Sequence, residues 1–348
     1  MSTRLLCVND LIILEDDDLD NIFDLVNDFQ IIFHPYYAIE GKFTHYKEYL
    51  MNKKEKIIVL DRNITSMLYD YFKDGELKEE NNMIMLLSFL MFCNCNRLQY
   101  NIGLAMNEYG DLTENSEVIR QLNTLLTYLS EIPSLVFLNR LKNGNFKLPK
   151  FDIPVKFQRH ANYNNKSITY LLSYCSVLKI AEIFLTKLST KNKILRYLDW
   201  YYDSLKISMY DITYAILLFT NYSTIKAPKN IKSKKFEKII RGCKNQAWDI
   251  SYLSSINNLQ YHFSDKEIFF ATNDKNLKLI FMGCHYFDNS WAGLIFDRIT
   301  NKKDRNDIFN LIEKKMLNRT NVDFNEEYLM NLSHSLEEKL KKAIIDTN

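Results

Sequence analysis

The sequence predicts an α/β protein with a short central parallel sheet, a large helical insertion and a helical C-terminal tail. Three observations support this class. Only eight glycines and five prolines occur in 348 residues, and sheet-rich folds need both residues at their many turns, so an all-β fold is disfavoured. A few short apolar runs have the length of buried strands. Most of the chain between them has a helical period, and hydrophobic residues make up 47% of the chain, enough for a large core.

The predicted strands are apolar runs of about four residues, each followed by a polar residue or glycine. Such unbroken runs are typical of parallel strands that are covered on both faces. The three clearest runs are Ile57–Leu60, Ile268–Ala271 and Leu279–Met282, and two further candidates are Leu11–Leu14 and Ile31–Phe33.

Helices are predicted wherever apolar residues recur with a period near 3.6. Ile119, Leu122, Leu126 and Leu129 keep this period, and the tail over 307–345 is also predicted to be helical. Two prolines, at 149 and 154, predict an extended connector over 148–157.

The strands lie far apart in the sequence, with a mainly helical stretch between them. We therefore predict one domain over 1–300, with its core at about 55–112 and 240–285, interrupted by a helical insertion at 115–235. Residues 301–348 form the predicted helical tail.

Several classes of function are disfavoured by composition. The closest glycines, Gly103 and Gly110, are too far apart for the usual glycine-rich phosphate loops. Six scattered cysteines, no apolar run long enough to span a membrane and no signal-peptide pattern predict a cytoplasmic protein without a membrane partner. The formal net charge of +2 does not by itself indicate a nucleic-acid partner.

Two aspartates follow predicted strands directly. Asp61 comes after Ile57–Leu60, and Asp274 comes shortly after Ile268–Ala271. Ligands bind at the carboxyl ends of strands in open α/β sheets, which makes both candidates for a site. The alternative is that Asp61 or Asn63 only caps the helix that follows, because both residue types suit that position.

Two further carboxylates are predicted on apolar helix faces. Glu108 shares a face with Leu104 and Leu112, and Asp249 shares one with Leu253 and other apolar residues. A buried charge needs a partner or a shifted pKa. Each could be a salt-bridged structural carboxylate, but four such groups together predict one acidic pocket.

An acidic pocket needs a cation at neutral pH. Carboxylate oxygens without dedicated His or Cys partners favour hard ions, so Mg²⁺ or Mn²⁺ is predicted rather than zinc. Such ions promote hydrolysis of phosphodiester bonds.

The ordered set of Asp61 with Asn63, Glu108, Asp249 and Thr272-x-Asp274 resembles the PIN-like nucleases. The resemblance covers about 55–112 and 240–285, and it implies a three-layer fold with a central parallel sheet. It implies that Asp61, Glu108, Asp249 and Asp274 are the catalytic, metal-holding carboxylates. Residues beside them would orient the site: Asn63, Thr272 and Asn273. Asp111, Glu114 and Glu117 are rivals for the position of Glu108.

A basic stretch precedes Asp249. Residues 226–244 contain eight basic side chains and one acid, so this stretch could lead a phosphate backbone toward the site. The predicted nucleic-acid contacts are Lys232, Lys234, Lys235, Lys238, Arg241 and Lys244. The alternative is an ordinary solvated surface.

Two functions follow. The first is a metal-dependent endonuclease, with RNA favoured over DNA, of the bacterial toxin or antiviral-defence type that the resemblance implies. The second is a non-catalytic PIN-like binding or regulatory protein whose helical insertion docks a protein partner. A homo-oligomer or a regulatory protein partner is compatible with both.

Overall fold

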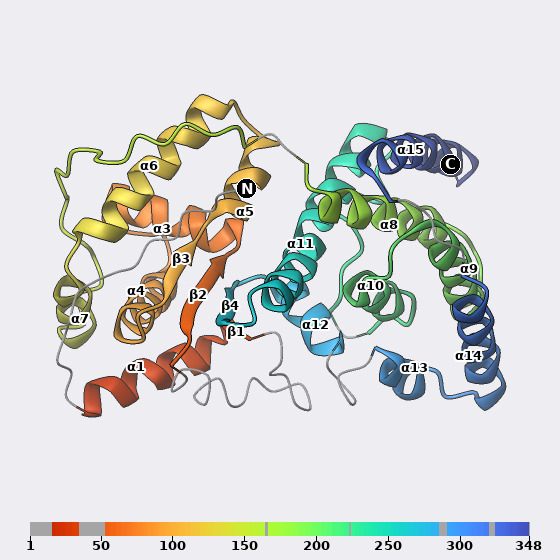
Figure 1. Cartoon of the computed structure of the whole chain (residues 1–348), viewed down its shortest axis with the longest axis horizontal. Coiled ribbons are helices and arrows are strands. Elements are labelled where there is room, and N and C mark those ends of the chain that lie inside the picture. Colours follow the sequence, from red (N-terminus) through yellow and green to blue (C-terminus); the bar gives the residue numbers. More distant parts are fainter. Residues whose placement is uncertain are drawn as a thin grey trace. The chain divides into compact units, whose positions relative to one another are not determined.

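A computed structural model describes residues 16–34, 53–163, 166–222, 224–284, 291–319 and 324–347. The protein is mostly helical (67%) with a small mixed sheet of four strands (Figure 1). The predicted α/β class is therefore confirmed.

The sheet has the strand order β1-β4-β2-β3, and all neighbours are parallel except β1, which runs antiparallel to β4. Two of the clearest apolar runs form β2 and β4, and the weaker candidate near residue 32 forms β1. The candidate Leu11–Leu14 lies outside the described residues. The bounds are β1 (Ile32–Phe33), β2 (Glu55–Leu60), β3 (Gln99–Asn101) and β4 (Lys266–Ala271).

The predicted strand at Leu279–Met282 is wrong, because these residues lie within helix α12 (Lys275–Cys284). The side chains that α12 buries include Leu277, Ile280, Phe281 and Cys284. Their spacing follows the helical period, which a four-residue apolar run is too short to reveal.

Strands β2 and β4 are buried on both faces. Ile58 and Phe269 belong to a core cluster shared with the surrounding helices. Their alternating neighbours, Val59 and Phe270, are also buried. This explains why both strands are continuous apolar runs rather than alternating ones.

The helices near the sheet form two packed groups, whose members alternate along the sequence. In the first, α4 (Glu80–Cys95) contacts both α1 (Asp16–Phe29) and α7 (Ser134–Lys142). In the second, α3 (Arg62–Asp74), α5 (Gly103–Gly110) and α6 (Asn115–Glu131) contact one another.

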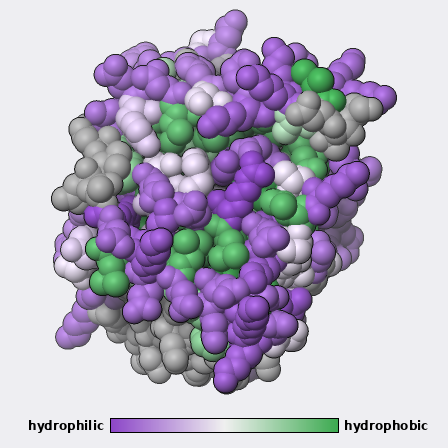
Figure 2. Space-filling model, turned by 90° about the vertical axis from the view of Figure 1, so that its right-hand side faces the viewer, coloured by the Kyte–Doolittle hydropathy of each residue, from purple (hydrophilic) through white to green (hydrophobic). Residues whose placement is uncertain are grey.

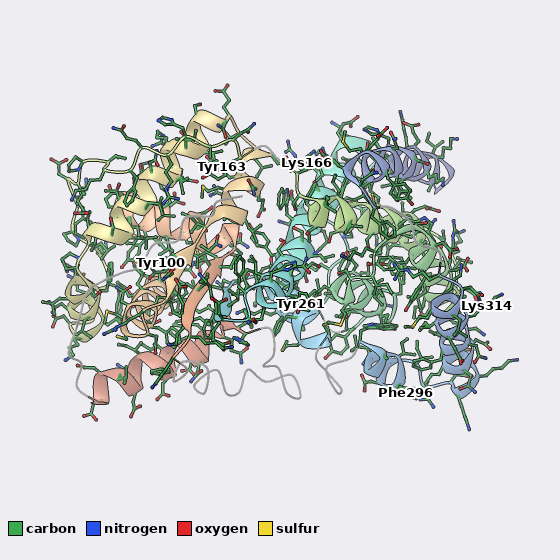
Figure 3. The ribbon with its side chains drawn as sticks, in the orientation of Figure 1. Tyr100, Tyr163, Lys166, Tyr261, Phe296 and Lys314 are labelled. Atoms are coloured by element: carbon green, nitrogen blue, oxygen red, sulfur yellow. The ribbon has the colours of Figure 1, made fainter. Side chains whose placement is uncertain are left out.

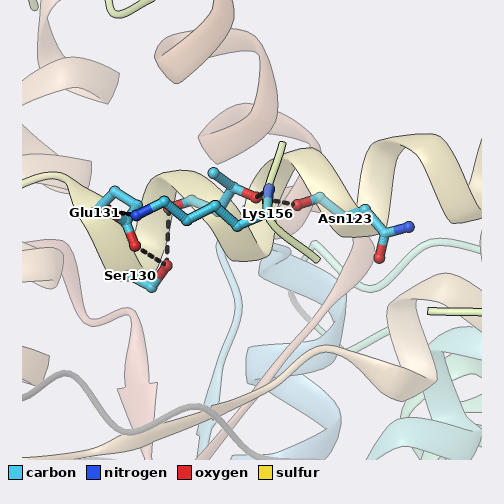
Figure 4. Close-up of polar contacts among 5 residues, drawn as sticks. Asn123, Ser130, Glu131 and Lys156 are labelled. Atoms are coloured by element: carbon cyan, nitrogen blue, oxygen red, sulfur yellow. Dashed lines mark hydrogen bonds and ion pairs between the residues drawn. The ribbon is translucent and has the colours of Figure 1, made fainter. Parts of the chain in front are cut away.

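The predicted extended connector at 148–157 is confirmed and is part of a longer segment without helix or strand. Side chains of α6 bind its backbone. The Lys156 amide donates to Thr127 Oγ1 at 3.1 Å (Figure 4). The Arg159 amide donates to Asn123 Oδ1 at 3.1 Å. Lys156 also pairs with Glu131. The segment is thereby held along α6.

The chain divides into two compact units, and each is discontinuous in sequence. Among the described residues, unit 1 contains 16–34, 53–163 and 256–274, and unit 2 contains the remainder. This differs from the predicted division, because 115–163 belongs to the unit with the sheet and the C-terminal tail belongs to unit 2.

Unit 2 is built from helices only in its described residues. The tail consists of two helices, of which α15 packs along α8 and α14 packs along α9. The face of unit 2 shown in Figure 2 is largely hydrophilic with separate hydrophobic spots. Phe296 and Lys314 mark α13 and α14 in Figure 3. The bounds are α8 (Ile168–Phe184), α9 (Thr190–Ser204), α10 (Met209–Phe219), α11 (Phe236–His262, of which 236–255 is in this unit), α13 (Ala292–Arg298), α14 (Lys302–Leu317) and α15 (Glu326–Thr347).

Candidate active site

The carboxyl ends of β2 and β4 lie side by side in unit 1. These two parallel strands are paired up to Leu60 and Ala271, and the backbone amide of Asp61 continues the pairing by donating to the Ala271 carbonyl at 3.0 Å. Residues that follow the two strands therefore meet at one edge of the sheet. This edge carries Asp61 from β2 and Thr272 from β4.

Both carboxylate oxygens of Asp61 accept hydrogen bonds. Oδ1 accepts from the Ile64 amide at 2.7 Å, which makes Asp61 the N-cap of α3. Oδ2 accepts from the Thr272 hydroxyl. The side chain is only 2% exposed. Asp61 therefore does cap the helix that follows it, as the alternative interpretation of the sequence predicted. Thr272 lies beside Asp61, in the place that the resemblance implies.

Thr272 also links Asp61 to Asp274. Its Oγ1 accepts a hydrogen bond from the Asp274 amide at 3.0 Å while its hydroxyl donates to Asp61. Asp274 is half-buried and directly precedes α12. One threonine side chain thus joins the two strand-end aspartates in a single network.

Burial raises the pKa of Asp61 to about 7. Hydrogen bonds from Ile64 and Thr272 lower the pKa, and the negative charge of Asp274 raises it further. A carboxyl that titrates near neutral pH beside a second carboxylate is typical of functional sites, although structural networks also perturb the pKa of buried groups.

The cationic residue that follows Asp61 directly was not predicted to be part of the site. Arg62, the first residue of α3, places its guanidinium carbon 3.7 Å from the centroid of the Tyr109 ring. Its Nη1 donates to Gln121 Oε1 at 2.8 Å. The partners are on α5 and α6, far from Arg62 in sequence. The adjacent Asp–Arg pair after a buried strand was the one signal available.

For the other site residues predicted in unit 1, no hydrogen bond to Asp61 from a side chain is described. Glu108 is half-buried on α5, a helix that contacts α3. The Asn63 side chain is exposed, and its backbone amide helps to lower the pKa of Asp61. Asn273 is half-buried between Thr272 and Asp274.

Asp249 and the basic stretch belong to unit 2. Asp249 is half-buried on α11, where its charge contributes to raising the pKa of Tyr214, after burial and Cys243. Most of the predicted nucleic-acid contacts are exposed: Lys232, Lys234, Lys235, Lys238 and Arg241, with Lys244 half-buried.

In the described residues, the four predicted carboxylates are divided between the units: Asp61, Glu108 and Asp274 lie in unit 1 and Asp249 lies in unit 2. Across the part of the chain that the structure describes, no three His, Cys, Asp or Glu side chains are grouped so that they could hold a metal ion together. Asp61 and Asp274 form a smaller set of two carboxylates. Such a set fits Mg²⁺ or Mn²⁺ only with water completing the coordination, since Mg²⁺ is often held by one or two carboxylates and several waters.

No helix in the described ranges has the length and apolar character needed to cross a bilayer. Comparisons with protein-family models, with curated proteins and with solved structures found no match to this chain.

Proposed function

We propose that the edge formed by Asp61, Thr272 and Asp274 is the active site of a divalent-metal-dependent endonuclease that hydrolyses RNA, with DNA as the alternative substrate. The observation that carries the proposal is the hydrogen-bonded network that joins two aspartates at the carboxyl ends of neighbouring parallel strands. The resemblance of the same residues to PIN-like nucleases supports it. The absence of His and Cys from the set favours Mg²⁺ or Mn²⁺.

Each residue has a distinct part in this proposal. Asp61 and Asp274 would hold the ion, which supplies a water of lowered pKa and neutralises charge on the phosphodiester. Thr272 is a positioning residue, because its hydroxyl fixes one oxygen of Asp61 and it accepts from the Asp274 amide. Arg62 adds a positive charge at the start of α3 and is suited to a phosphate oxygen.

The test is Mn²⁺-dependent cleavage of single-stranded RNA by Asp61→Asn and Asp274→Asn. Both changes keep the size of the side chain and remove one charge, so we expect at least a hundredfold loss of cleavage with the fold intact by circular dichroism. Asp265→Asn is the matched control, because Asp265 is exposed just before β4. It should cleave like the unmodified protein. Unchanged cleavage by a folded double variant of Asp61 and Asp274 would refute the proposal.

Two variants of Thr272 test whether its hydroxyl positions the aspartates that are proposed to hold the metal. Thr272→Ser keeps the hydroxyl and should keep most of the cleavage activity, whereas Thr272→Val removes it and should weaken Mn²⁺ affinity. Isothermal titration calorimetry with Mn²⁺ measures that affinity without depending on turnover.

The second candidate is a non-catalytic PIN-like binding or regulatory protein. The observation that favours it is that Asp61 is 2% exposed and has both oxygens hydrogen-bonded within the protein, one of them as the N-cap of α3. On this alternative, Mn²⁺ does not bind in calorimetry and no RNA is cleaved. Asp61→Ala would then lower stability without changing any activity.

A further inference from the structure

A carboxyl group in unit 2 is buried without a partner. Asp211 lies in the first turn of α10 and is 1% exposed. Neither of its oxygens has a hydrogen-bond partner. In the part of the chain that the structure describes, no Lys, Arg or His nitrogen forms an ion pair with it. This group is separate from the network at the sheet edge.

Four hydroxyl groups surround Asp211 and help to hold down its pKa. They belong to Ser173 and Ser176 on α8, Tyr201 on α9 and Ser208, the N-cap of α10. Each is close enough to lower the pKa of Asp211, but none meets the geometry of a full hydrogen bond to either carboxylate oxygen. The Ser173 hydroxyl is itself buried without a partner.

The other hydroxyls are held in place by different groups. Ser176 Oγ lies 2.8 Å from the Tyr197 hydroxyl, and Ser208 Oγ lies 3.1 Å from Ser254 Oγ. The Tyr201 hydroxyl accepts from the Ser208 amide at 2.9 Å. Because that amide is occupied, Asp211 cannot complete a capping box with Ser208, which would be its ordinary structural role.

An oxygen-rich, buried and singly charged set is suited to a small cation. A buried charged carboxylate without a compensating partner is strongly destabilising. Hard cations take oxygen ligands, and here a carboxylate and four hydroxyls are gathered in one buried place. The set has one negative charge, so an ion of charge +1 neutralises it, whereas an ion of charge +2 would leave a buried positive charge.

We propose that Asp211, Ser173, Ser176, Tyr201 and Ser208 form a buried site in unit 2 for a monovalent alkali cation, Na⁺ or K⁺.

The titration of Asp211 sets the pH above which the ion is needed. Burial raises the pKa of Asp211 to about 6. The titratable groups that face it are Cys175 on α8 and Tyr197 and Tyr201 on α9, and burial raises the pKa of each, so they stay neutral. Arg319 faces Tyr201 and donates to the Leu205 carbonyl. Above pH 6 the carboxylate is therefore charged, and the ion takes the place of the proton.

The test is thermal unfolding at pH 8 in choline chloride, NaCl and KCl at equal ionic strength. We expect the melting temperature of the unmodified protein to rise with the concentration of Na⁺ or K⁺ by several degrees more than with choline. Asp211→Asn removes the charge without changing the shape, and it should abolish this difference. Glu338→Gln is the control, because Glu338 is exposed on α15, and it should keep the full difference.

Ser173→Ala provides a second variant that retains the carboxylate. It removes one oxygen ligand, so it should shift the response to a higher cation concentration. Broadening of the ²³Na resonance at pH 8, lost in Asp211→Asn, would be a direct sign of binding. Equal melting temperatures in choline, Na⁺ and K⁺ overturn the proposal, as does a full alkali response in Asp211→Asn. Stabilisation by lowering the pH through 6, without any alkali effect, would mean that a proton alone neutralises Asp211.

Discussion

Asp61 and Asp211 are both fully buried carboxyl groups, but their surroundings differ. Asp61 accepts a hydrogen bond at each oxygen, from a helix amide and from Thr272. Asp211 accepts none. Burial raises the pKa of both, to about 7 for Asp61, which also has Asp274 nearby, and to about 6 for Asp211. A raised pKa in the folded state makes protein stability depend on pH.

We predict that stability without metal falls as the pH rises from about 4 to about 7. The pKa of Asp61 is raised from 3.8 to about 7 on folding, so the native state binds more protons than the unfolded state within this window. Deprotonation therefore favours unfolding, by up to the order of 4 kcal/mol for this one group. Urea unfolding in EDTA at several pH values measures the effect.

Asp61→Asn identifies the group responsible, because its amide does not titrate. This variant should have a flatter stability profile between pH 4 and 7. The exposed Asp265→Asn should keep the original profile. If the profile of Asp61→Asn matches that of the unmodified protein, Asp61 does not titrate in this range.

At the scale of single elements, α3 shows how one helix connects the site to the rest of unit 1. It begins at its N-cap Asp61 and ends at Gly75, which has φ of 77°. The Gly75 carbonyl accepts from the Leu148 amide at 2.7 Å. A Cβ atom at Gly75 would lie 2.7 Å from the Leu148 carbonyl oxygen. Gly75 therefore ends the helix and also allows the extended connector to approach closely.

We predict that Gly75→Ala destabilises the protein more than Gly144→Ala. Both glycines have positive φ, and a Cβ at Gly144 meets no atom within 4 Å. Gly144→Ala should therefore cost only the backbone strain, on the order of 1 kcal/mol. Gly75→Ala adds a backbone clash and should cost roughly 2 kcal/mol or more. Chemical denaturation measures both values, and equal losses would contradict the role of close approach.

For the molecule as a whole, a lysine that is distant in sequence lies close to the basic stretch at 226–244. Lys341 on α15 has its Nζ 5.9 Å from the ring of Phe236, at the start of α11. The lysines of the stretch are largely exposed. Unit 2 therefore presents a positive surface on more than one element, although the net charge of the chain is only +2. Such a surface suits a phosphate backbone.

We predict that changing Lys232, Lys234 and Lys235 to Glu weakens RNA binding and flattens its dependence on salt. Fewer released counterions reduce the slope of log affinity against log salt. The control changes Lys302, Lys303 and Lys314 of α14 to Glu, which alters the net charge equally at another exposed position. Fluorescence anisotropy with labelled RNA measures both quantities. Equal effects of the two triple variants would indicate that only net charge matters.

Much of the fold follows from local patterns. Two apolar runs formed β2 and β4 because strands covered on both faces are apolar throughout. The strand-end positions of Asp61 and Asp274 followed from these runs. The run at Leu279–Met282 became a helix, because four apolar residues fit either structure and the flanking residues decide.

The α/β class, two of the central strands and the aspartates that follow them are predictable from the amino-acid sequence, because these features depend on the period and composition of short segments. Which side chains contact one another, in contrast, depends on the packing of the folded chain. Thr272 donates to Asp61 across 211 positions of sequence, and Arg62 contacts Gln121 across 59. The packing also leaves Asp211 buried among hydroxyls without a hydrogen bond. Contacts between distant segments depend on how whole helices and strands pack, and no local pattern records that packing.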